Sequence, residues 1–378
     1  MIGTRNSGKS SFLNFLRTSL ALPYRKQRHA RTNGDFAADS PPPSSAGSHN
    51  FTSHYVETEI DSERIGLTLW DSQGLEKSIV DLQLREMSNF LESKFEDTFT
   101  EEMKVVRAPG VRDTHIHCVF LVLDPIRLDA NVAAAQAVSN STTNGGYMAD
   151  KAPRIVGGLD EDLDLQVLRA LQGKTTVVPV ISKADTITTA HMAFLKRTVS
   201  DSLKKANLDP LEALGLDDVE AESSTDLLDE REEDAELAKK PARPDDLSSS
   251  QSTSSDSEPH SPKKPKRPFS HVRTPSSVSQ SSPASAAETP YLPLSIISPD
   301  MYDTTPGPGG KVGRKFPWGF ADPHNVEHCD FLKLKEAVFS EWRGELREAS
   351  RELWYEGWRT SRLDTSAGRL GAGKSGRR

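Results

Sequence analysis

The segment that most constrains the fold of this chain is an eight-residue sequence at positions 3–10, which runs directly into a helical pattern. It reads G-T-R-N-S-G-K-S and matches the phosphate-binding pattern G-x-x-x-x-G-K-[ST]. In residues 9–20, apolar side chains recur at the spacing of a half-buried helix: Phe12, Leu13, Phe15, Leu16 and Leu20. Such a loop can hold phosphate through backbone N–H groups and the positive end of the helix. We therefore predict a nucleotide-binding α/β fold.

Within this loop the residue types suggest separate roles. The Lys9 ammonium can reach the β and γ phosphates, and the Ser10 hydroxyl can bind Mg²⁺. The predicted phosphate-binding residues are Gly3, Thr4, Arg5, Asn6, Ser7, Gly8, Lys9, Ser10 and Ser11.

The same pattern occurs a second time, at residues 368–375. Only three residues follow it, so we expect neither a helix to supply N–H groups nor a strand before it. We interpret residues 361–378 as a flexible basic tail. The pattern alone is therefore weak support for a nucleotide site.

A second motif, D-S-Q-G at residues 71–74, follows two predicted strands at 54–60 and 65–70 that form a hairpin. Asp71 could hold Mg²⁺ through a water molecule, and the Gly74 amide could sense the γ-phosphate. D-x-x-G is also common in ordinary turns. Its position between the phosphate loop and the next motif favours the functional interpretation.

The third motif, S-K-A-D at residues 182–185, follows the apolar strand 177–181. The Asp185 carboxylate can accept hydrogen bonds from N1–H and the 2-amino group of guanine, whereas adenine offers neither donor. The aliphatic part of Lys183 can lie over the base. The alternative is a plain surface K-x-D turn. The order of the three motifs favours GTP or GDP with Mg²⁺ as the ligands.

Strands and helices alternate along most of the chain. Nearly continuous apolar runs at 115–123 and 175–181 predict parallel strands covered on both faces. Helical patterns occupy 82–95, 160–171 and 191–206. This alternation predicts an α/β fold, a P-loop G domain with a doubly wound, mainly parallel sheet.

Only 35% of the 378 residues are hydrophobic, and the polar residues gather in a few segments. We expect mobile loops or insertions at 24–50 and 129–153, and a disordered insertion at 217–289 that is first acidic and then rich in Ser and Pro. The G domain would then comprise 1–216 and continue in 290–360.

Composition also excludes some functions. The net charge of −8 and the isoelectric point near 5.8 give no reason to expect nucleic-acid binding. Two cysteines cannot form a disulfide framework, which favours a reducing, cytoplasmic compartment. We find no apolar run long enough to span a bilayer. The basic residues at 263–267 and in the tail predict at most a weak supplementary contact with anionic lipid.

Several stretches resemble one family, the septins. Residues 313–319, G-R-K-F-P-W-G, resemble the septin signature G-R-x-Y-P-W-G, and 327–331, E-H-C-D-F, resemble the start of the septin unique element. Residues 178–188 are similar to the septin base-recognition strand and loop, which usually reads A-K-A-D, with Ser182 in place of the first alanine. Arg107 with 113–118, and Tyr355, Glu356 and Arg359, continue the resemblance.

The resemblance implies a guanine-nucleotide-binding cytoskeletal protein. Arg314 would contact the guanine, and Trp318 would lie in the nucleotide-side interface between neighbouring subunits. The implied partners are other septins, in homo- or hetero-oligomers that form filaments or rings. The implied location is a septin ring at the cell cortex or division septum, with a role in septum formation and cytokinesis.

The chain also departs from the septin pattern. We expect the strand before the phosphate loop to be missing, because only Met1 and Ile2 precede it. Gly157-Gly158 replaces a glycine-histidine pair of an interface loop. Septins have a Mg²⁺-binding threonine in the first switch loop. Either Ser48 or Thr52 could correspond to it in this chain.

Two further departures concern GTP hydrolysis and the C-terminal coiled coil that many septins carry. Leu75 stands where Ras-like enzymes place a glutamine that orients the attacking water, so we expect slow hydrolysis at most and name no catalytic residue. No heptad repeat follows residue 359, so we expect no coiled coil. Two alternatives stay open: a slow monomeric GTPase switch, and a pseudo-GTPase or nonfunctional fragment.

Overall fold

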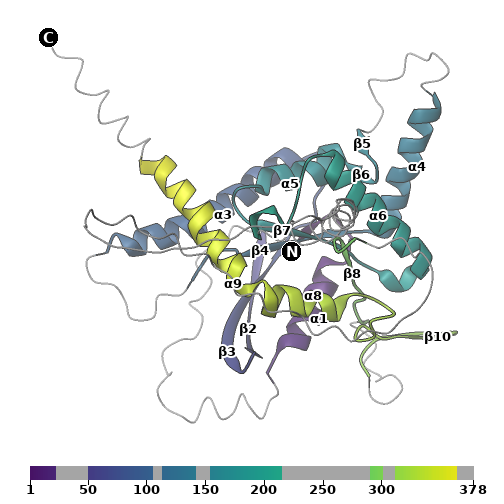
Figure 1. Ribbon diagram of the computed structural model, residues 1–378, viewed down its shortest axis with the longest axis horizontal. Helices are drawn as coiled ribbons and strands as arrows, with labels where there is room; N and C mark the ends of the chain where they lie inside the picture. The colour runs from purple at the N-terminus through teal and green to yellow at the C-terminus, as the bar shows by residue number, and fades with distance from the viewer. Residues whose placement is uncertain (23–49, 105–112, 142–153, 215–289, 301–310, 364–378) are drawn as a thin grey trace, which may run out of the picture. The chain divides into compact units, whose positions relative to one another are not determined.

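The computed structural model describes residues 1–22, 50–104, 113–141, 154–214, 290–300 and 311–363 (Figure 1). Several predictions lie outside these residues: those on Ser48, Arg107, the insertion at 217–289 and the second loop pattern at 368–375. The described residues before 215 and after 289 belong to one structural unit, because strands from both parts pair in one sheet.

That sheet contains four parallel strands in the order β1, β4, β7, β8. They span Ile2–Gly3, Cys118–Leu123, Thr176–Ile181 and Leu294–Ser295. Figure 1 labels β4, β7 and β8 of this sheet. Every residue of β7 is buried, as is all of β4 after Cys118. Strands covered on both faces have this pattern, because helices pack against each side of a parallel sheet. The predicted α/β fold with a parallel sheet is confirmed.

A long antiparallel hairpin lies beside β1. Its strands are β2, Phe51–Ile60, and β3, Glu63–Ser72. The Met1 nitrogen donates to the Trp70 carbonyl at 2.8 Å, and the Ser72 N–H donates to the Met1 carbonyl at 3.3 Å. Leu75 N–H then donates to the Gly3 carbonyl at 3.0 Å. These bonds place the end of β3 next to the start of the phosphate loop.

The prediction that the first strand is missing is wrong for the residues present. Ile2 pairs with Leu121 and Gly3 with Val122, and the Ile2 side chain is only 6% exposed. A Cβ on Gly3 would lie 2.4 Å from the Val122 carbonyl oxygen. Glycine is therefore required where β1 ends and the phosphate loop begins. Two residues suffice for a strand here because β3 and β4 supply bonds on both sides.

The helices follow the expected pattern with one exception. They are α1 Lys9–Leu20, α3 Val80–Glu102, α4 Pro125–Ser141, α5 Gln166–Leu171, α6 Thr189–Lys205, α8 Phe331–Glu336 and α9 Arg343–Glu348. π-helical turns at Ala337–Glu341 and Ala349–Tyr355 follow α8 and α9, and helix continues to residue 363. Among the described residues, no helix is long and apolar enough to cross a membrane.

The exception is residues 129–141, which we predicted to be part of a loop and which lie in α4. The run N-V-A-A-A-Q-A-V is rich in alanine, the residue with the highest helix propensity. Leu128 and Asn131 are buried on this helix, and Asn131 donates to the Gly158 carbonyl at 2.9 Å. The packing of α4 on the β5–β6 hairpin therefore reinforces local propensity.

Two short hairpins complete the described fold. β5, Ile155–Val156, pairs with β6, Leu159–Asp160, and β9, Arg314–Phe316, pairs with β10, Gly319–Ala321. The second hairpin comes from the part of the chain that follows the 217–289 segment. It thus brings C-terminal residues to the site built by the first part.

The aspartate of the E-H-C-D-F stretch, Asp330, joins three elements. The Asp330 carboxylate accepts bonds from the Ser295 N–H at 2.7 Å and the Ser295 hydroxyl at 2.6 Å, and it pairs with Lys196. Burial raises the pKa of Asp330, but Lys196 and these bonds outweigh burial and hold it below its ordinary value. Asp330 thus ties α8 to β8 and α6.

A buried histidine joins α3 to the C-terminal helical region. Nε2 of His115 lies 2.9 Å from the Thr98 hydroxyl, and Nδ1 lies 3.2 Å from the Ser350 hydroxyl. The ring also packs edge-on against Phe95 at 5.0 Å. Burial lowers the pKa of His115, with Asp113 opposing the shift. A neutral imidazole is therefore part of the packed interior.

This site predicts a dependence of stability on pH. The unfolded chain binds a proton at His115 near pH 6.5, whereas the folded chain binds it only at lower pH. We expect the stability due to neutral His115 to be complete above about pH 6.5 and to fall as the pH drops toward 5. Thermal unfolding of the wild type and of His115→Gln between pH 5 and 7.5 measures this. The difference between their midpoints should change across this window; a constant difference would contradict the account.

Candidate functional site

The phosphate loop has the backbone geometry of an anion-binding turn. Asn6 and Gly8 have φ values of 63° and 90°, and Gly8 lies directly before the first turn of α1. The Ser7 N–H bonds to the Thr4 carbonyl at 3.3 Å, which closes the turn. Alternating left- and right-handed residues point successive N–H groups to one side, where they can bind an anion. The loop predicted from the sequence therefore lies on a helix N-terminus.

Lys9 crosses this loop. Its side-chain nitrogen donates to the Gly3 carbonyl at 3.0 Å and to the Thr4 carbonyl at 2.7 Å, which uses two of its three N–H groups. Burial lowers the pKa of Lys9, and the Asp71 carboxylate opposes that shift. The cation is thus held at the loop by backbone oxygens of the loop itself, where a phosphate would meet it.

Ser10 and Asp71 lie together although 61 residues separate them. The Ser10 hydroxyl donates to Oδ2 of Asp71 at 2.7 Å. Oδ1 of Asp71 is buried and has no hydrogen-bond partner. A hydroxyl and a carboxylate with a free oxygen are ligands that Mg²⁺ accepts, directly or through water. The residues present therefore fit a magnesium ion.

Of the two candidates for the Mg²⁺-binding threonine, the structure describes only Thr52. Thr52 lies directly opposite Asp71 in the β2–β3 register, so both side chains share one face of the hairpin. Ser48, the other candidate, lies outside the described residues. The register thus brings Thr52 to the side of the hairpin that carries Asp71.

Gly74 lies against the backbone of the phosphate loop. A Cβ at this position would be 2.7 Å from Cα of Arg5, so only glycine permits this approach. The Gly74 carbonyl accepts from the Gln83 side chain at 3.1 Å. The next residue, Leu75, is 3% exposed and belongs to the core. The Leu75 side chain is therefore packed in the hydrophobic core.

The second residue of the S-K-A-D loop has an uncommon backbone conformation. Lys183 has a φ of 55°, a left-handed conformation that is uncommon outside glycine. Its side-chain nitrogen pairs with Oδ2 of Asp124 at 2.6 Å, and the Ala184 N–H bonds to the Ile296 carbonyl at 3.0 Å. These contacts fix the loop between β4 and β8.

Asp124 is a residue that our sequence interpretation missed. It directly follows β4, whose last residue, Leu123, is in register with Ile181 at the end of β7. Since the carboxyl ends of neighbouring parallel strands meet at one edge, Asp124 and Lys183 necessarily come close. The position of an acid directly after a predicted strand was the signal that could have identified it.

The Asp185 carboxylate is buried and has one oxygen without a hydrogen-bond partner. Its side chain is 1% exposed, and Oδ2 accepts from Nη1 of Arg314 at 2.7 Å. Oδ1 is buried without a hydrogen-bond partner. A buried acceptor of this kind is costly unless a ligand supplies a donor. Arg314, for which a guanine contact was expected, lies against this carboxylate and orients it.

The β9–β10 hairpin presents an exposed aromatic surface beside Arg314. Trp318 is 83% exposed and stacks on Phe316, with ring centroids 5.3 Å apart and an interplanar angle of 17°. The Arg314 guanidinium lies 5.8 Å from the centre of the Phe316 ring. A large exposed apolar side chain next to a ligand site is typical of an interaction surface.

The β5–β6 turn leaves no room for a side chain. Gly157 has a φ of 65°, and a Cβ there would lie 2.3 Å from the Ser202 hydroxyl. At Gly158 a Cβ would lie 3.0 Å from Cγ2 of Thr198, and the Gly158 N–H donates to the Ser202 hydroxyl at 3.0 Å. The two glycines that depart from the septin pattern therefore allow the β5–β6 turn to pack closely against α6.

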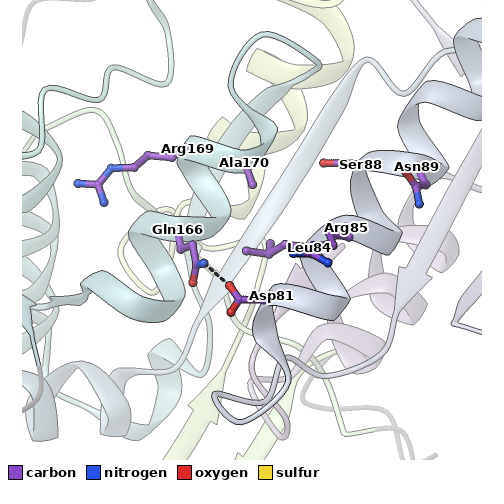
Figure 2. Close-up of a pocket in the computed structure, with 8 residues that line it drawn as sticks. All are labelled: Asp81, Leu84, Arg85, Ser88, Asn89, Gln166, Arg169 and Ala170. Atoms are coloured by element: carbon purple, nitrogen blue, oxygen red, sulfur yellow. Dashed lines mark hydrogen bonds between the residues drawn. The ribbon is translucent and has the colours of Figure 1, made fainter.

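A groove of about 480 Å³ lies elsewhere, between α3 and α5 (Figure 2). Across it, the Gln166 side chain donates to Asp81 at 2.6 Å. None of the predicted nucleotide-binding residues lines this groove. In the described part of the chain, no group of three or more His, Cys, Asp or Glu side chains could hold a metal ion. The phosphate loop and the S-K-A-D loop remain the candidate site.

Comparisons with known proteins agree on one family. The family model named Septin matches residues 156–238 and 271–371. Septin-2A of Xenopus laevis is 23% identical over 366 residues, which cover 96% of this chain and 74% of that protein. These matches support membership of the septin family.

Other septins match with lower coverage. Septin-1 of Homo sapiens is 23% identical over 82% of this chain and 60% of its own length. Cell division control protein 11 of Saccharomyces cerevisiae is 22% identical over 82% of this chain and 54% of its own length. A solved septin GTPase domain from Chlamydomonas reinhardtii aligns over 95% of this chain and 96% of that one, with 16% identity and a TM-score of 0.47. Membership of the septin family implies a guanine nucleotide as the ligand.

The role of Lys9 gives a direct prediction. Lys9→Ala removes a charged donor from the phosphate loop, so we expect GDP affinity to fall about 10- to 150-fold, or about 1.5–3 kcal/mol. Titration of a fluorescent GDP analogue measures this, with circular dichroism to verify folding.

The chain supplies a matched control in Lys374, the lysine of the second loop pattern. Lys374→Ala should bind GDP like the wild type. Equal affinities of Lys9→Ala and the wild type would refute the phosphate-loop assignment.

Proposed function

We propose that this septin binds GTP and GDP with Mg²⁺ and assembles with other septins through the surface that surrounds the nucleotide. The phosphate loop, Ser10 and Asp71 hold the phosphates and metal, and Lys183, Asp185 and Arg314 hold the base. The assemblies are filaments or rings of the cytoskeleton at the cell cortex or septum, where they act in septum formation and cytokinesis.

The observation that carries nucleotide binding is the state of Asp185. One carboxylate oxygen is fixed by Arg314, and the other is buried without a partner. Guanine presents two donors, N1–H and the 2-amino group, whereas adenine presents an acceptor at N1 and no 2-amino group. Binding of guanine therefore satisfies the buried oxygen, and binding of adenine leaves it unpaired.

The Asp185 assignment predicts the selectivity between bases. Asp185→Asn should reduce the preference for GDP over ADP by about 1–3 kcal/mol, because the amide cannot accept both bonds. Competition of each nucleotide against a fluorescent GDP analogue measures the preference. Asp129→Asn, a change in an acid of α4 that pairs with His191, serves as the control. An unchanged GDP preference in Asp185→Asn would exclude this role.

Assembly is supported by the exposed aromatic hairpin. Trp318 lies on the same short hairpin as Arg314, so a subunit that covers Trp318 also covers the nucleotide. This arrangement supports a coupling of association to nucleotide binding. The Gly157-Gly158 turn, which has no side chain to offer a partner, is compatible with a partner different from this chain.

The hairpin predicts the outcome of a single substitution. Trp318→Ala should shift the GDP-bound chain from dimer to monomer, because burial of a large aromatic residue dominates many interfaces. Light scattering across a range of concentrations measures this.

Met103→Ala is the matched control, since Met103 is 70% exposed at the end of α3. A dimer that withstands Trp318→Ala but dissociates with Met103→Ala would place the interface elsewhere.

Hydrolysis is a secondary part of the proposal. Leu75 follows Gly74 and belongs to the core, so no side chain at this position can orient water. Any GTP turnover would be slow, and nucleotide would serve mainly to stabilise the interface. This supports a structural role rather than a fast switch.

A further inference from the structure

A buried hydroxyl connects the two halves of the nucleotide site. Ser182, the first residue after β7, donates from Oγ to the Ser7 carbonyl at 2.6 Å. Both side chains are almost wholly enclosed, with exposures of 2% for Ser182 and 0% for Ser7. Oγ also lies 3.1 Å from the Leu123 carbonyl, but a hydroxyl carries one proton and the Ser7 contact is much shorter.

The Ser7 carbonyl needs a partner outside the helix. The first carbonyl of the α1 ladder is that of Gly8, which accepts from Phe12 N–H at 2.9 Å. Ser7 lies one residue earlier, in the phosphate loop, and is excluded from this ladder. Since a buried carbonyl without a partner is unfavourable, Ser182 stabilises this conformation of the loop.

Gly8 also lies beside Ser182. A Cβ added to Gly8 would be 3.6 Å from Cβ of Ser182. The Ser182 N–H is fixed in turn by the Leu123 carbonyl at 3.0 Å. Lys9 comes directly after Gly8 in the phosphate loop, and Lys183 comes directly after Ser182 in the base-recognition loop. A shift of either loop would therefore move the other.

We infer that Ser182 is a positioning residue, which holds the base-recognition loop against the phosphate loop and so slows the dissociation of guanine nucleotide. Ser182 acts through Ser7 and Lys183 rather than by contact with the ligand. This inference rests on the proposed function. It also gives a role to the serine that replaces the usual first alanine of the A-K-A-D sequence.

The test uses the full chain and a fluorescent GDP analogue. Ser182→Ala should release the analogue about three- to tenfold faster than the wild type, the effect of one lost buried hydrogen bond. Ser182→Thr keeps the hydroxyl and should release it at close to the wild-type rate. Ser350→Ala is the matched control, because Ser350 is also fully buried but bonds to His115.

The affinity for guanosine distinguishes a positioning role of Ser182 from a general loss of structure in the variant. Guanosine, which lacks phosphates, engages the base loop alone, so its affinity should change less than twofold in Ser182→Ala. The ratio of GDP affinity to guanosine affinity should therefore fall. If both affinities fall equally, or if Ser350→Ala releases GDP as fast as Ser182→Ala, Ser182 is merely structural.

Different results would contradict nucleotide binding and the role of Ser182. A folded wild type that binds no guanine nucleotide would overturn the proposed function itself. A wild type that binds GDP, with release from Ser182→Ala at the wild-type rate, would overturn only the role of Ser182.

Discussion

The close approach of Gly3 to the Val122 carbonyl is the constraint on which the rest of the site depends. Only a residue without Cβ can lie so close to β4 at this point, and the phosphate loop begins there. Two residues of β1 bond to β4 on one side, and Met1 bonds to β3 on the other. The loop is therefore held by backbone bonds of strands from distant parts of the sequence.

The parallel sheet then gathers the remaining groups. β4 and β7 end side by side, so Asp124 and the S-K-A-D loop emerge at the same edge as the phosphate loop. β3 brings Asp71 to Ser10 from the other side. The site is thus made of strand ends, and buried carboxylate oxygens of Asp71 and Asp185 have no hydrogen-bond partner. We propose that they serve the metal ion and the guanine.

Much of this fold could be predicted from the sequence because its signals are local. The helix at Lys9–Leu20 follows from apolar spacing, and β4 and β7 follow from continuous apolar runs. The helical state of 129–141 is not evident from the sequence, because its alanine run has little apolar periodicity and polar residues follow it. The two-residue β1 was missed because its stability comes from neighbouring strands.

The contacts that complete the site are not local. Arg314 lies 129 residues from Asp185, and Ser182 lies 175 residues from Ser7. A motif shows which residue types are present, but the packing of distant elements decides which donor meets which acceptor. The resemblance to septins suggested a guanine contact for Arg314, whereas its bond to Asp185 and the Ser182 bond to Ser7 emerged only from the fold.

The measurement that tests the central claim most directly is the nucleotide content of the purified chain. The protein would be denatured, and the released bases separated by chromatography and quantified against protein concentration. The account predicts close to one guanine nucleotide per chain and no adenine nucleotide. A folded chain that carries no nucleotide and takes up neither GTP nor GDP in the presence of Mg²⁺ would contradict it.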